Sequence, residues 1–382
     1  MTIVFLTNFI NHHQVHFADA LAATEGVDYH LIQTMPMPDS FKNNGYPDYS
    51  TRPYIINAYE SDQEMARARK LIDDADVAIL GDAPREWGVK RIEENKVTFN
   101  NEERWFRRFH IFSHRAVRNW WHYHTRFRNK PLYMLCMGAF VPYDVSRIFA
   151  YPHKTYRWGY LTKVPEFDIE SSLVEKRESK KFRLLYVSRM LKLKHPDMMV
   201  GLANYLRGKG YDFEINMYGK GEEMEEKMHA LISENNLGDY VHMLGVLPND
   251  RILDEMRKHH AFLFTSDKEE GWGAVVNEAM ANGCTVVGGN RIGSVPFLIE
   301  PHKTGLIFKD RNQKSLNQCA EYLLTHRDEC EQMALNGYKL LRDVWSPANG
   351  AKNFIRLAKS ALAGKIDPPE YGPGSIAPII KG

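Results

Sequence analysis

The sequence TSDKEEGWGAVVNEAMANG runs from Thr265 to Gly283 and carries the densest pattern of polar and glycine residues in the chain. It follows a short apolar run and continues into a helical pattern, so we expect a strand, a loop and a helix in succession. Gly271 and Gly273 let the loop backbone approach a ligand closely, and a helix beginning near Gly273 directs unpaired N–H groups toward an anion. The segment therefore predicts a phosphate-binding turn in an α/β domain.

Similar units extend outward from this segment in both directions. Short apolar runs alternate with longer helical patterns, which is typical of α/β layering with parallel strands. In the second half we expect strands at 183–187, 214–218, 241–244, 261–265, 285–288 and 305–308. In the first half we expect them at 2–6, 29–33, 77–80, 96–99 and 132–135. The sequence therefore predicts two doubly wound α/β domains.

The domain boundaries follow from composition. Residues 164–181 are charged and poor in large apolar side chains, as interdomain linkers often are. Ser346 and Pro347 have the residue types of an N-cap and a first helical turn, and we expect that helix to pack back toward the first domain. The predicted organisation is an N-terminal domain 1–163, a linker 164–181, a C-terminal domain 182–345, a helix 346–364 and a loosely held Pro- and Gly-rich tail 365–382.

Composition excludes several classes of protein. The 382 residues are 43% hydrophobic and 26% charged, which is normal for a globular protein and argues against disorder. A net charge of +2 gives no general attraction to nucleic acid. The four cysteines lack paired metal-ligand spacing, and no apolar run reaches the length of a membrane span or signal peptide. We therefore expect a cytoplasmic protein that is soluble or peripheral on a membrane.

Two carboxylates and two cations form the candidate site. Glu278 lies within the predicted helix, where it can accept hydrogen bonds from the two hydroxyls of a ribose, while Glu270 stays in the loop near a sugar. Arg189 and Lys194 follow the strand at 183–187, at the edge of the sheet where α/β domains bind ligands. Their charges could grip a diphosphate and stabilise it as it departs.

These segments resemble a known family. EGWGAVVNEAMANG is similar to the Glu-x7-Glu signature of glycosyltransferase family 4, and SRMLKLKH resembles that family's GR-x-x-x-x-KG segment. YGKGEE, LGVLPNDRILDEM and NRIGSVPFLIEPHKTGLIF also match, so the resemblance covers most of the second half. It implies a GT-B fold with two Rossmann-like domains facing a cleft, transfer with retained anomeric configuration, and no essential metal or cofactor. Ser188 and His195 depart from the pattern, because glycine is usual at both positions.

The resemblance also assigns roles residue by residue. Glu270 would contact sugar hydroxyls, Glu278 the ribose, and backbone amides after Glu270 the phosphate or sugar. Gly219 either ends a strand or lines the donor site. The resulting catalytic set is Glu270, Arg189 and Lys194, and the donor-binding set is Glu278, Gly271, Trp272, Gly273, Ala274, Val246, Leu247 and Gly219, with Val246 and Leu247 near the base.

The acceptor side is less clearly marked. Family members carry a histidine after a later strand of the first domain, and none stands in the corresponding place here. The leaving phosphate can itself accept the acceptor proton in transfer of this class, so a protein base is not required. Acids at this point could position an acceptor or simply begin a helix. The acceptor-side candidates are Asn11, His12, His13, Asp82, Glu102 and Glu103, and we expect no metal at the histidine pair, for which no further ligand is evident.

One stretch is unusual in composition. Between Arg104 and Arg128 the sequence RWFRRFHIFSHRAVRNWWHYHTRFR combines aromatic residues with seven arginines and has no acidic residue. Such a stretch could contact an anionic membrane surface or a lipid-diphosphate acceptor. It could equally form an amphipathic helix whose aromatic side chains fill the domain core while the arginines are solvated. The sequence leaves both interpretations open.

The leading functional hypothesis is sugar transfer from a nucleotide-diphosphate sugar to a glycan or lipid-linked acceptor, in surface polysaccharide biosynthesis. A second hypothesis is another GT-B nucleotide-sugar reaction, such as epimerisation. A third is a catalytically silent module that binds nucleotide or glycan. None of the three requires nucleic acid.

Overall fold

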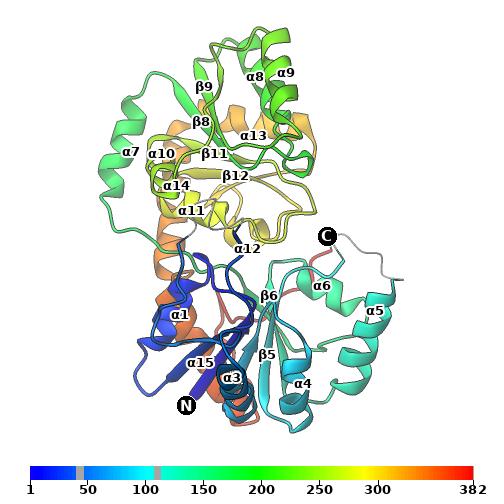
Figure 1. Cartoon of the computed structure of the whole chain (residues 1–382). Coiled ribbons are helices and arrows are strands. Elements are labelled where there is room, and N and C mark those ends of the chain that lie inside the picture. Colours follow the sequence, from blue (N-terminus) through cyan, green and yellow to red (C-terminus); the bar gives the residue numbers. More distant parts are fainter. Residues whose placement is uncertain (40–46, 107–112, 382) are drawn as a thin grey trace. The chain divides into compact units, whose positions relative to one another are not determined.

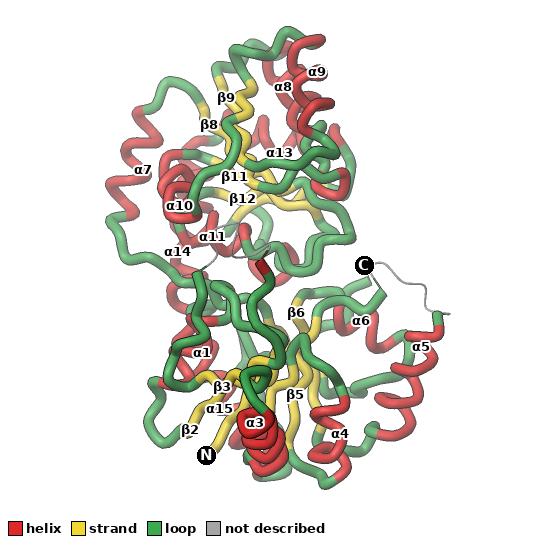
Figure 2. The backbone as a smooth tube through the Cα atoms, viewed as in Figure 1, coloured by secondary structure: helices red, strands yellow, loops and turns green. Residues whose placement is uncertain are grey.

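The computed structural model describes residues 1–39, 47–106 and 113–381. The chain forms two compact units, and the C-terminal residues belong to the first of these units. Unit 1 comprises Met1–Thr162 and Val344–Gly382, and unit 2 comprises Lys163–Asp343. Each unit is built on a parallel sheet, which Figure 2 shows in yellow.

The sheet of unit 1 has the strand order β3-β2-β1-β4-β5-β6-β7, and all of its neighbouring strands run parallel. The central strands are almost fully buried, as expected for a sheet that is covered on both faces. Its strands are β1 (Thr2–Thr7), β2 (Asp28–Gln33), β3 (Ile55–Asn57), β4 (Val77–Leu80), β5 (Val97–Glu102), β6 (Leu132–Met137) and β7 (Thr155–Trp158).

Helices connect these strands and cover the sheet. Helix α15, in orange to red near the end of the chain, packs beside α1 in Figure 1. Phe354 of α15 contacts the rings of Phe17 and Phe99, so the C-terminal helix is part of this core. The helical segments are α1 (Val15–Ala22), α3 (Asp62–Asp74), α4 (Glu86–Glu93), α5 (His114–Asn119), a π-helical turn (Trp120–Arg126), α6 (Val141–Ser146) and α15 (Pro347–Leu362).

Unit 2 repeats the arrangement with the strand order β10-β9-β8-β11-β12-β13. Its strands are β8 (Phe182–Val187), β9 (Phe213–Tyr218), β10 (Val241–Met243), β11 (Ala261–Phe264), β12 (Thr285–Gly289) and β13 (Gly305–Phe308). Its helices are α7 (Ile169–Glu178), a 3₁₀ turn (Lys192–Lys194), α8 (Met198–Gly208), α9 (Glu225–Glu234), α10 (Asn249–Lys258), α11 (Val275–Ala281), α12 (Val295–Leu298), α13 (Gln313–Thr325) and α14 (Arg327–Asp343). Every predicted strand is present, and the prediction of two parallel α/β domains is confirmed.

Two strands were not predicted. β3 has only three residues, too few for an apolar pattern to stand out. β7 alternates buried Tyr156 and Trp158 with more accessible residues, and it lies at the edge of the sheet. Such short edge strands can be identified from their pairing with a neighbouring strand, but not from their own composition.

The segment predicted as a linker is not a free connection. Residues 164–181 belong to unit 2 and include α7. The buried apolar side chains of α7, Ile169 and Leu173, lie about one helical turn apart and pack with Tyr338 of α14. A low apolar content therefore concealed a helix with one narrow buried stripe.

The segment predicted as a loose tail is also tied down. Arg157 of β7 donates its backbone N–H to the carbonyl of Ser375 at 2.7 Å, and Ala377 donates to Thr155 at 3.0 Å. Ser375 and Ala377 are buried. The Pro- and Gly-rich composition here reflects tight turns beside an edge strand instead of disorder.

The C-terminal helix begins where the sequence indicated. Ser346 is the N-cap of α15 and its hydroxyl accepts the N–H of Asn349 at 3.3 Å, with Pro347 at the first helical position. Among the described residues, no helix combines the length and the apolar character needed to cross a membrane.

Candidate active site

The candidate donor residues lie where the strand order of unit 2 reverses. β8 pairs directly with β11, although they are not consecutive in the chain, and β9 and β12 flank this pair on either side. Loops that leave the carboxyl ends of two such strands diverge and create a ligand-binding crevice. Arg189 and Lys194 follow β8, and Glu270 and Glu278 follow β11. All four therefore belong to the place where the strand order reverses, which is called the switch point below.

Lys194 and Glu270 meet directly. The Lys194 Nζ donates to Glu270 Oε2 in an ion pair whose side chains are only 12% and 16% exposed. Thr265 donates its hydroxyl to the Lys194 carbonyl at 2.8 Å, and Phe264 places its ring 5.3 Å from the Lys194 nitrogen. Lys194 and Glu270, both of the predicted catalytic set, are therefore in direct contact, and Thr265 and Phe264 hold Lys194 in place.

The neighbouring residue explains one departure from the family pattern. His195 has a φ of 47°, in the left-handed region where glycine is favoured. Its Nε2 lies 3.3 Å from Asp267 Oδ2, and the Asp267 backbone N–H donates to the Leu193 carbonyl at 2.9 Å. These contacts stabilise a histidine in a conformation that usually requires glycine, and they join the loops after β8 and β11.

Gly219 supports the loop after β8 from behind. With φ at 139°, a Cβ on Gly219 would lie 1.8 Å from the carbonyl oxygen of Ser188. The Gly219 N–H also donates to Gly245 at 2.6 Å. Glycine is therefore required at position 219 because the backbone of Ser188 passes very close to it. The next residue, Arg189, has an exposed side chain.

The glycine loop before α11 is similarly crowded. Gly273 has a φ of 83°, and a Cβ there would lie 2.5 Å from the Phe264 ring. Trp272 is buried, and its ring N–H donates to the side-chain oxygen of Asn277 at 2.8 Å. Only the backbone of Trp272 could therefore contact a nucleotide-sugar. Gly271 and Ala274 complete this turn.

The remaining donor candidates lie at the ends of this region. α11 begins at Val275, and Glu278 lies in its first turn. Val246 is 61% exposed and Leu247 is partly buried, so neither is part of the core.

In unit 1, the first group of acceptor-side candidates follows β1. The rings of His12 and His13 are 3.7 Å apart, and the His13 ring is 4.9 Å from that of Tyr160. Asn11 accepts the His13 backbone N–H through its side-chain oxygen at 2.9 Å. These contacts hold the loop in a compact turn.

The second group follows β4 and β5. Helix initiation at Glu102 and Glu103 is wrong, because β5 continues through Glu102 and no helix starts there. Glu102 accepts the ring N–H of Trp105 and lies 3.7 Å from an Arg85 nitrogen. Asp82 is exposed after β4, and its carbonyl accepts the N–H of Asn8 at 2.6 Å.

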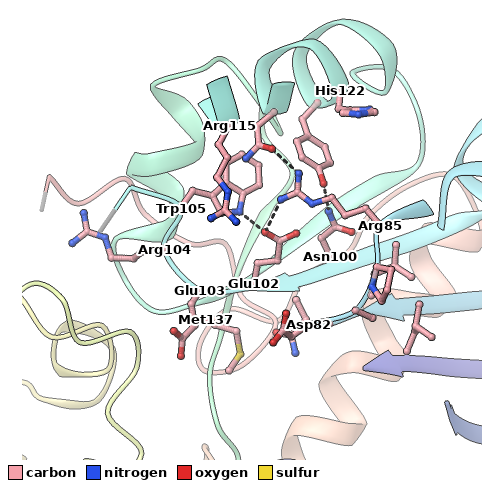
Figure 3. Close-up of a pocket in the computed structure, with 18 of the residues that line it drawn as sticks. Asp82, Arg85, Asn100, Glu102, Glu103, Arg104, Trp105, Arg115, His122 and Met137 are labelled. Atoms are coloured by element: carbon pink, nitrogen blue, oxygen red, sulfur yellow. Dashed lines mark hydrogen bonds and ion pairs between the residues drawn. The ribbon is translucent and has the colours of Figure 1, made fainter. Parts of the chain in front are cut away.

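A cavity of about 650 Å³ in unit 1 brings this second group together. Asp82, Glu102 and Glu103 line it, whereas Asn11, His12 and His13 do not. Figure 3 shows the acids and Asn100 along the strand ends, with Arg85 and Trp105 linked to Glu102 by dashed lines. The cavity therefore has an acidic side on the strands and a basic side on the segments that follow them.

The stretch between Arg104 and Arg128, called the Arg-aromatic stretch below, has both buried and exposed side chains. Residues 107–112 lie outside the described part of the chain. Tyr123 and Phe127 are buried, as expected for aromatic residues in a domain core. Trp120 and Trp121 are 41% and 48% exposed, and Val117 is 61% exposed. The stretch therefore contributes to the core of unit 1 and also presents apolar side chains to solvent.

The second unit is similar to known glycosyltransferases. Residues 168–340 match the family model described as glycosyl transferases group 1. Curated relatives include the GtfA subunit of the UDP-N-acetylglucosamine–peptide N-acetylglucosaminyltransferase of Streptococcus agalactiae, 25% identical over 114 residues, 30% of this chain and 22% of that protein. The corresponding subunit of Limosilactobacillus reuteri is 25% identical over 136 residues, 36% of this chain and 26% of that protein. The chain thus spans about a quarter of the length of these curated relatives.

Solved structures resemble the whole chain. A glycosyltransferase from Rickettsia africae has a TM-score of 0.67 at 14% identity, covering 94% of this chain and 98% of that one. Sucrose-phosphate synthase from Thermosynechococcus elongatus has the same TM-score and identity, covering 96% and 100%. HepE from Anabaena, solved with UDP, has a TM-score of 0.66 at 14% identity, covering 94% and 100%. The chain has the GT-B fold. The predicted fold class is thereby confirmed.

Sequence reasoning missed several residues of the unit 1 cavity. Arg85, Arg118, His122 and Tyr123 line it, together with Trp105. A usable signal existed for Arg85, since it follows the strand at 77–80 by a few residues, as Asp82 does. The others belong to the Arg-aromatic stretch, whose composition does not by itself indicate a cavity.

Proposed function

We propose that this chain is a retaining glycosyltransferase of family 4 that transfers a sugar from a nucleotide-diphosphate sugar, with unit 2 as its donor domain. The observation that carries the proposal is the ion pair of Lys194 and Glu270 at the β8/β11 switch point, with Arg189 in the same loop. The match of unit 2 to group 1 glycosyltransferases supports it, as does the fold shared with HepE, which was solved with UDP and with UDP-glucose.

The chemistry follows from the charges. The charge of Lys194 is balanced by that of Glu270. A bound diphosphate would compete for the lysine, releasing the Glu270 carboxylate to accept hydrogen bonds from sugar hydroxyls. Lys194 and Arg189 would then stabilise the negative charge that develops on the leaving diphosphate. Two protein cations could supply this charge, so we propose a reaction without an essential metal.

The proposed contacts of the donor follow the same geometry. Glu278 would hold the ribose, and Val246 and Leu247 would lie beside the base. Backbone amides of Gly271, Trp272, Gly273 and Ala274 would contact phosphate or sugar. We propose that the acceptor hydroxyl attacks on the face that the diphosphate leaves and that its proton passes to the leaving phosphate, which retains the configuration.

A ligand screen with product analysis tests this function. Nucleoside diphosphates and their sugars should raise the melting temperature of the full chain, because a ligand that binds only the folded state stabilises it. Mass analysis after incubation with the selected donor and an acceptor should show an added sugar. An epimerase would leave the mass unchanged, and a silent module would bind nucleotide without turnover. Absence of any stabilising nucleotide would contradict the donor assignment.

We also propose a peripheral location on the inner face of the cytoplasmic membrane, with a glycan or lipid-linked acceptor of surface polysaccharide biosynthesis. Trp120, Trp121 and Val117 are exposed, and the Arg126 guanidinium lies 5.6 Å from the Trp121 ring, a combination that suits an anionic lipid interface. In a flotation assay, the chain should rise with vesicles containing anionic lipid at low salt and should remain behind with neutral vesicles. Equal flotation with both, or none, would contradict this location.

A further inference from the structure

The cavity of unit 1 contains polar atoms that the described residues leave without a partner. The Asn101 side-chain oxygen and the His122 Nδ1 are both buried and accept no hydrogen bond from the described part of the chain. Both residues line the cavity. Buried polar atoms are rarely unpaired in folded proteins, because such atoms lose water without replacement. Because both atoms are covered, the two side chains would turn toward the cavity on binding, and the hydroxyl groups of a ligand would then provide the missing donors.

Charges in the cavity are separated by side. On the strand side, Asp82 and Glu102 offer carboxylate oxygens. On the helical side lie Arg85, Arg115 and Arg118, of which Arg118 is exposed and has no ion pair with a described residue. Arg85 is held in place by Glu102 and by Asn119, which accepts one of its guanidinium N–H groups. One side of a ligand would therefore meet hydroxyl-binding oxygens and the other would meet guanidinium groups.

The pKa of His122 is affected by the positive charges of nearby arginines. Burial lowers its pKa, and the positive charges of Arg126, Arg85 and Arg118 lower that pKa further. A group whose protonated form is disfavoured by three cations lies in a region of positive potential. An anion bound beside Arg118 would reduce that potential and raise the pKa of His122.

Aromatic rings complete the cavity. Trp105 stacks on Tyr123, with ring centroids 5.2 Å apart and an interplanar angle of 30°. Tyr123 is buried and the Arg85 guanidinium lies 5.5 Å from its ring, so the pair is held in place. A stacked indole with a polar surround is suited to the apolar face of a sugar ring.

We propose that this cavity binds the acceptor and that the acceptor is an anionic sugar, with its phosphate or carboxylate at Arg118 and Arg115 and its hydroxyls at Asn101 and Asp82. The role as acceptor rests on the proposed function, whereas binding of an anionic sugar rests on the cavity alone. The volume of about 650 Å³ is in the usual range for a small-molecule site.

The test measures binding of three probes to the full chain by calorimetry. The probes are methyl β-D-glucoside, methyl β-D-glucuronide and α-D-glucose 1-phosphate. An anionic probe should bind at least tenfold tighter than the neutral glucoside, since hydrogen bonds to charged groups are the stronger ones. The tighter of the two anionic probes distinguishes a carboxylate source from a phosphate source. Equal affinity for all three, or no binding, would overturn the proposal.

Two variants remove the same charge inside and outside the cavity. Arg118→Gln should weaken binding of the preferred anionic probe about tenfold, and Arg128→Gln, at an exposed arginine of the same stretch that does not line the cavity, should leave it unchanged. The NMR titration of the His122 ring should show a higher pKa with the probe bound. Equal losses in both variants, or an unmoved His122 pKa, would contradict the placement of the anion.

The proposed function can fail independently. Nucleoside diphosphates are screened against the same protein preparation. Stabilisation by a nucleotide without binding of an anionic sugar would leave the donor site standing and overturn only the acceptor cavity. Binding of an anionic sugar without any nucleotide effect would overturn the glycosyltransferase function and leave the cavity as a binding site.

Discussion

The switch point of unit 2 and the cavity of unit 1 occupy equivalent places, at the carboxyl ends of parallel strands, but differ in how their charges are satisfied. In unit 2, Lys194 forms an ion pair with Glu270, and His195 Nε2 lies 3.3 Å from Asp267 Oδ2. In unit 1, Asn101 and His122 have buried polar atoms without a described partner. The Lys194–Glu270 pair is therefore preorganised by its own residues, whereas the cavity of unit 1 keeps unpaired groups for what it binds. The Ser266 hydroxyl, after β11, is also buried without a described partner, so the contrast concerns the ion pair and not every polar group of unit 2.

A buried ion pair holds the chain that forms the wall of the cavity, and removing it should have the largest effect. Arg104 and Asp144 are 7% and 1% exposed, and Asp144 also accepts the Phe106 N–H at 3.1 Å. Asp144→Asn would leave the Arg104 charge buried and unpaired, at a cost of about 3–5 kcal/mol in the free energy of unfolding. Urea denaturation followed by circular dichroism measures this loss.

The matched control is Asp367→Asn, which removes the exposed pair of Asp367 with Arg356 in the same unit. Exposed pairs contribute at most about 1 kcal/mol, so the two substitutions should differ clearly. If they destabilise the protein equally, the buried pair does not support the cavity wall as described.

On the unit 2 side, the sharpest change is Lys194→Met, which keeps much of the side-chain volume and removes the charge. We expect turnover to fall about 10²–10³-fold, the usual effect of removing one group that stabilises developing negative charge. Lys192→Met is the control, because Lys192 lies in the same 3₁₀ turn and is exposed. Steady-state kinetics with the donor found in the screen would reject the assignment if both variants lost activity alike.

Glycine substitutions test whether preorganisation depends on close backbone packing. Gly219→Ala would place a Cβ 1.8 Å from the Ser188 carbonyl oxygen and displace the loop that carries Arg189. We expect nucleotide affinity to fall by about 1–3 kcal/mol, the range typical of local backbone strain. Gly210 also has a positive φ, of 77°, but its Cβ would meet nothing within 4 Å. Calorimetry should show normal affinity for Gly210→Ala, and a normal Gly219→Ala would contradict the packing argument.

The contrast between the two sites also explains which features could be predicted from the sequence. The strand, glycine loop and helix around Glu270 lie within one short segment, so their spacing alone predicted the donor turn. Ser346 and Pro347 likewise gave the start of α15, because helix capping is a local property. Local chemistry of this kind is visible in a single sequence.

The cavity of unit 1 was not visible for the opposite reason. Arg104 depends on Asp144, forty residues away in the chain, and Arg85 depends on Glu102 and Asn119. No periodicity links such partners. The pairing of the tail with β7 and the stripe of α7 were missed in the same way, because composition describes a segment and not the surface on which it packs.

The smallest effect concerns two histidines whose pKa values are both lowered by burial but whose ring nitrogens are partnered differently. His122 of unit 1 has an unpaired Nδ1, whereas His260 of unit 2 uses both ring nitrogens. His260 Nδ1 accepts the Arg183 N–H at 3.0 Å and its Nε2 donates to the Lys176 carbonyl at 2.8 Å. Burial lowers the pKa of His260 to about 3, and protonation would also destroy the bond from Arg183.

The sign of the pH effect follows from proton uptake. The unfolded chain protonates this histidine near pH 6.5, while the folded chain does so only near pH 3, so the unfolded state binds more protons between these values. Stability should therefore fall as the pH drops below about 6.5, by up to about 1.4 kcal/mol per pH unit for this one proton. His260→Gln should flatten that slope in urea unfolding between pH 4.5 and 7, and His326→Gln, at an exposed site in the same unit, should not. An unchanged slope in His260→Gln would show that the pH dependence arises elsewhere, and the contrast between a satisfied histidine in unit 2 and an unsatisfied one in unit 1 would lose its energetic basis.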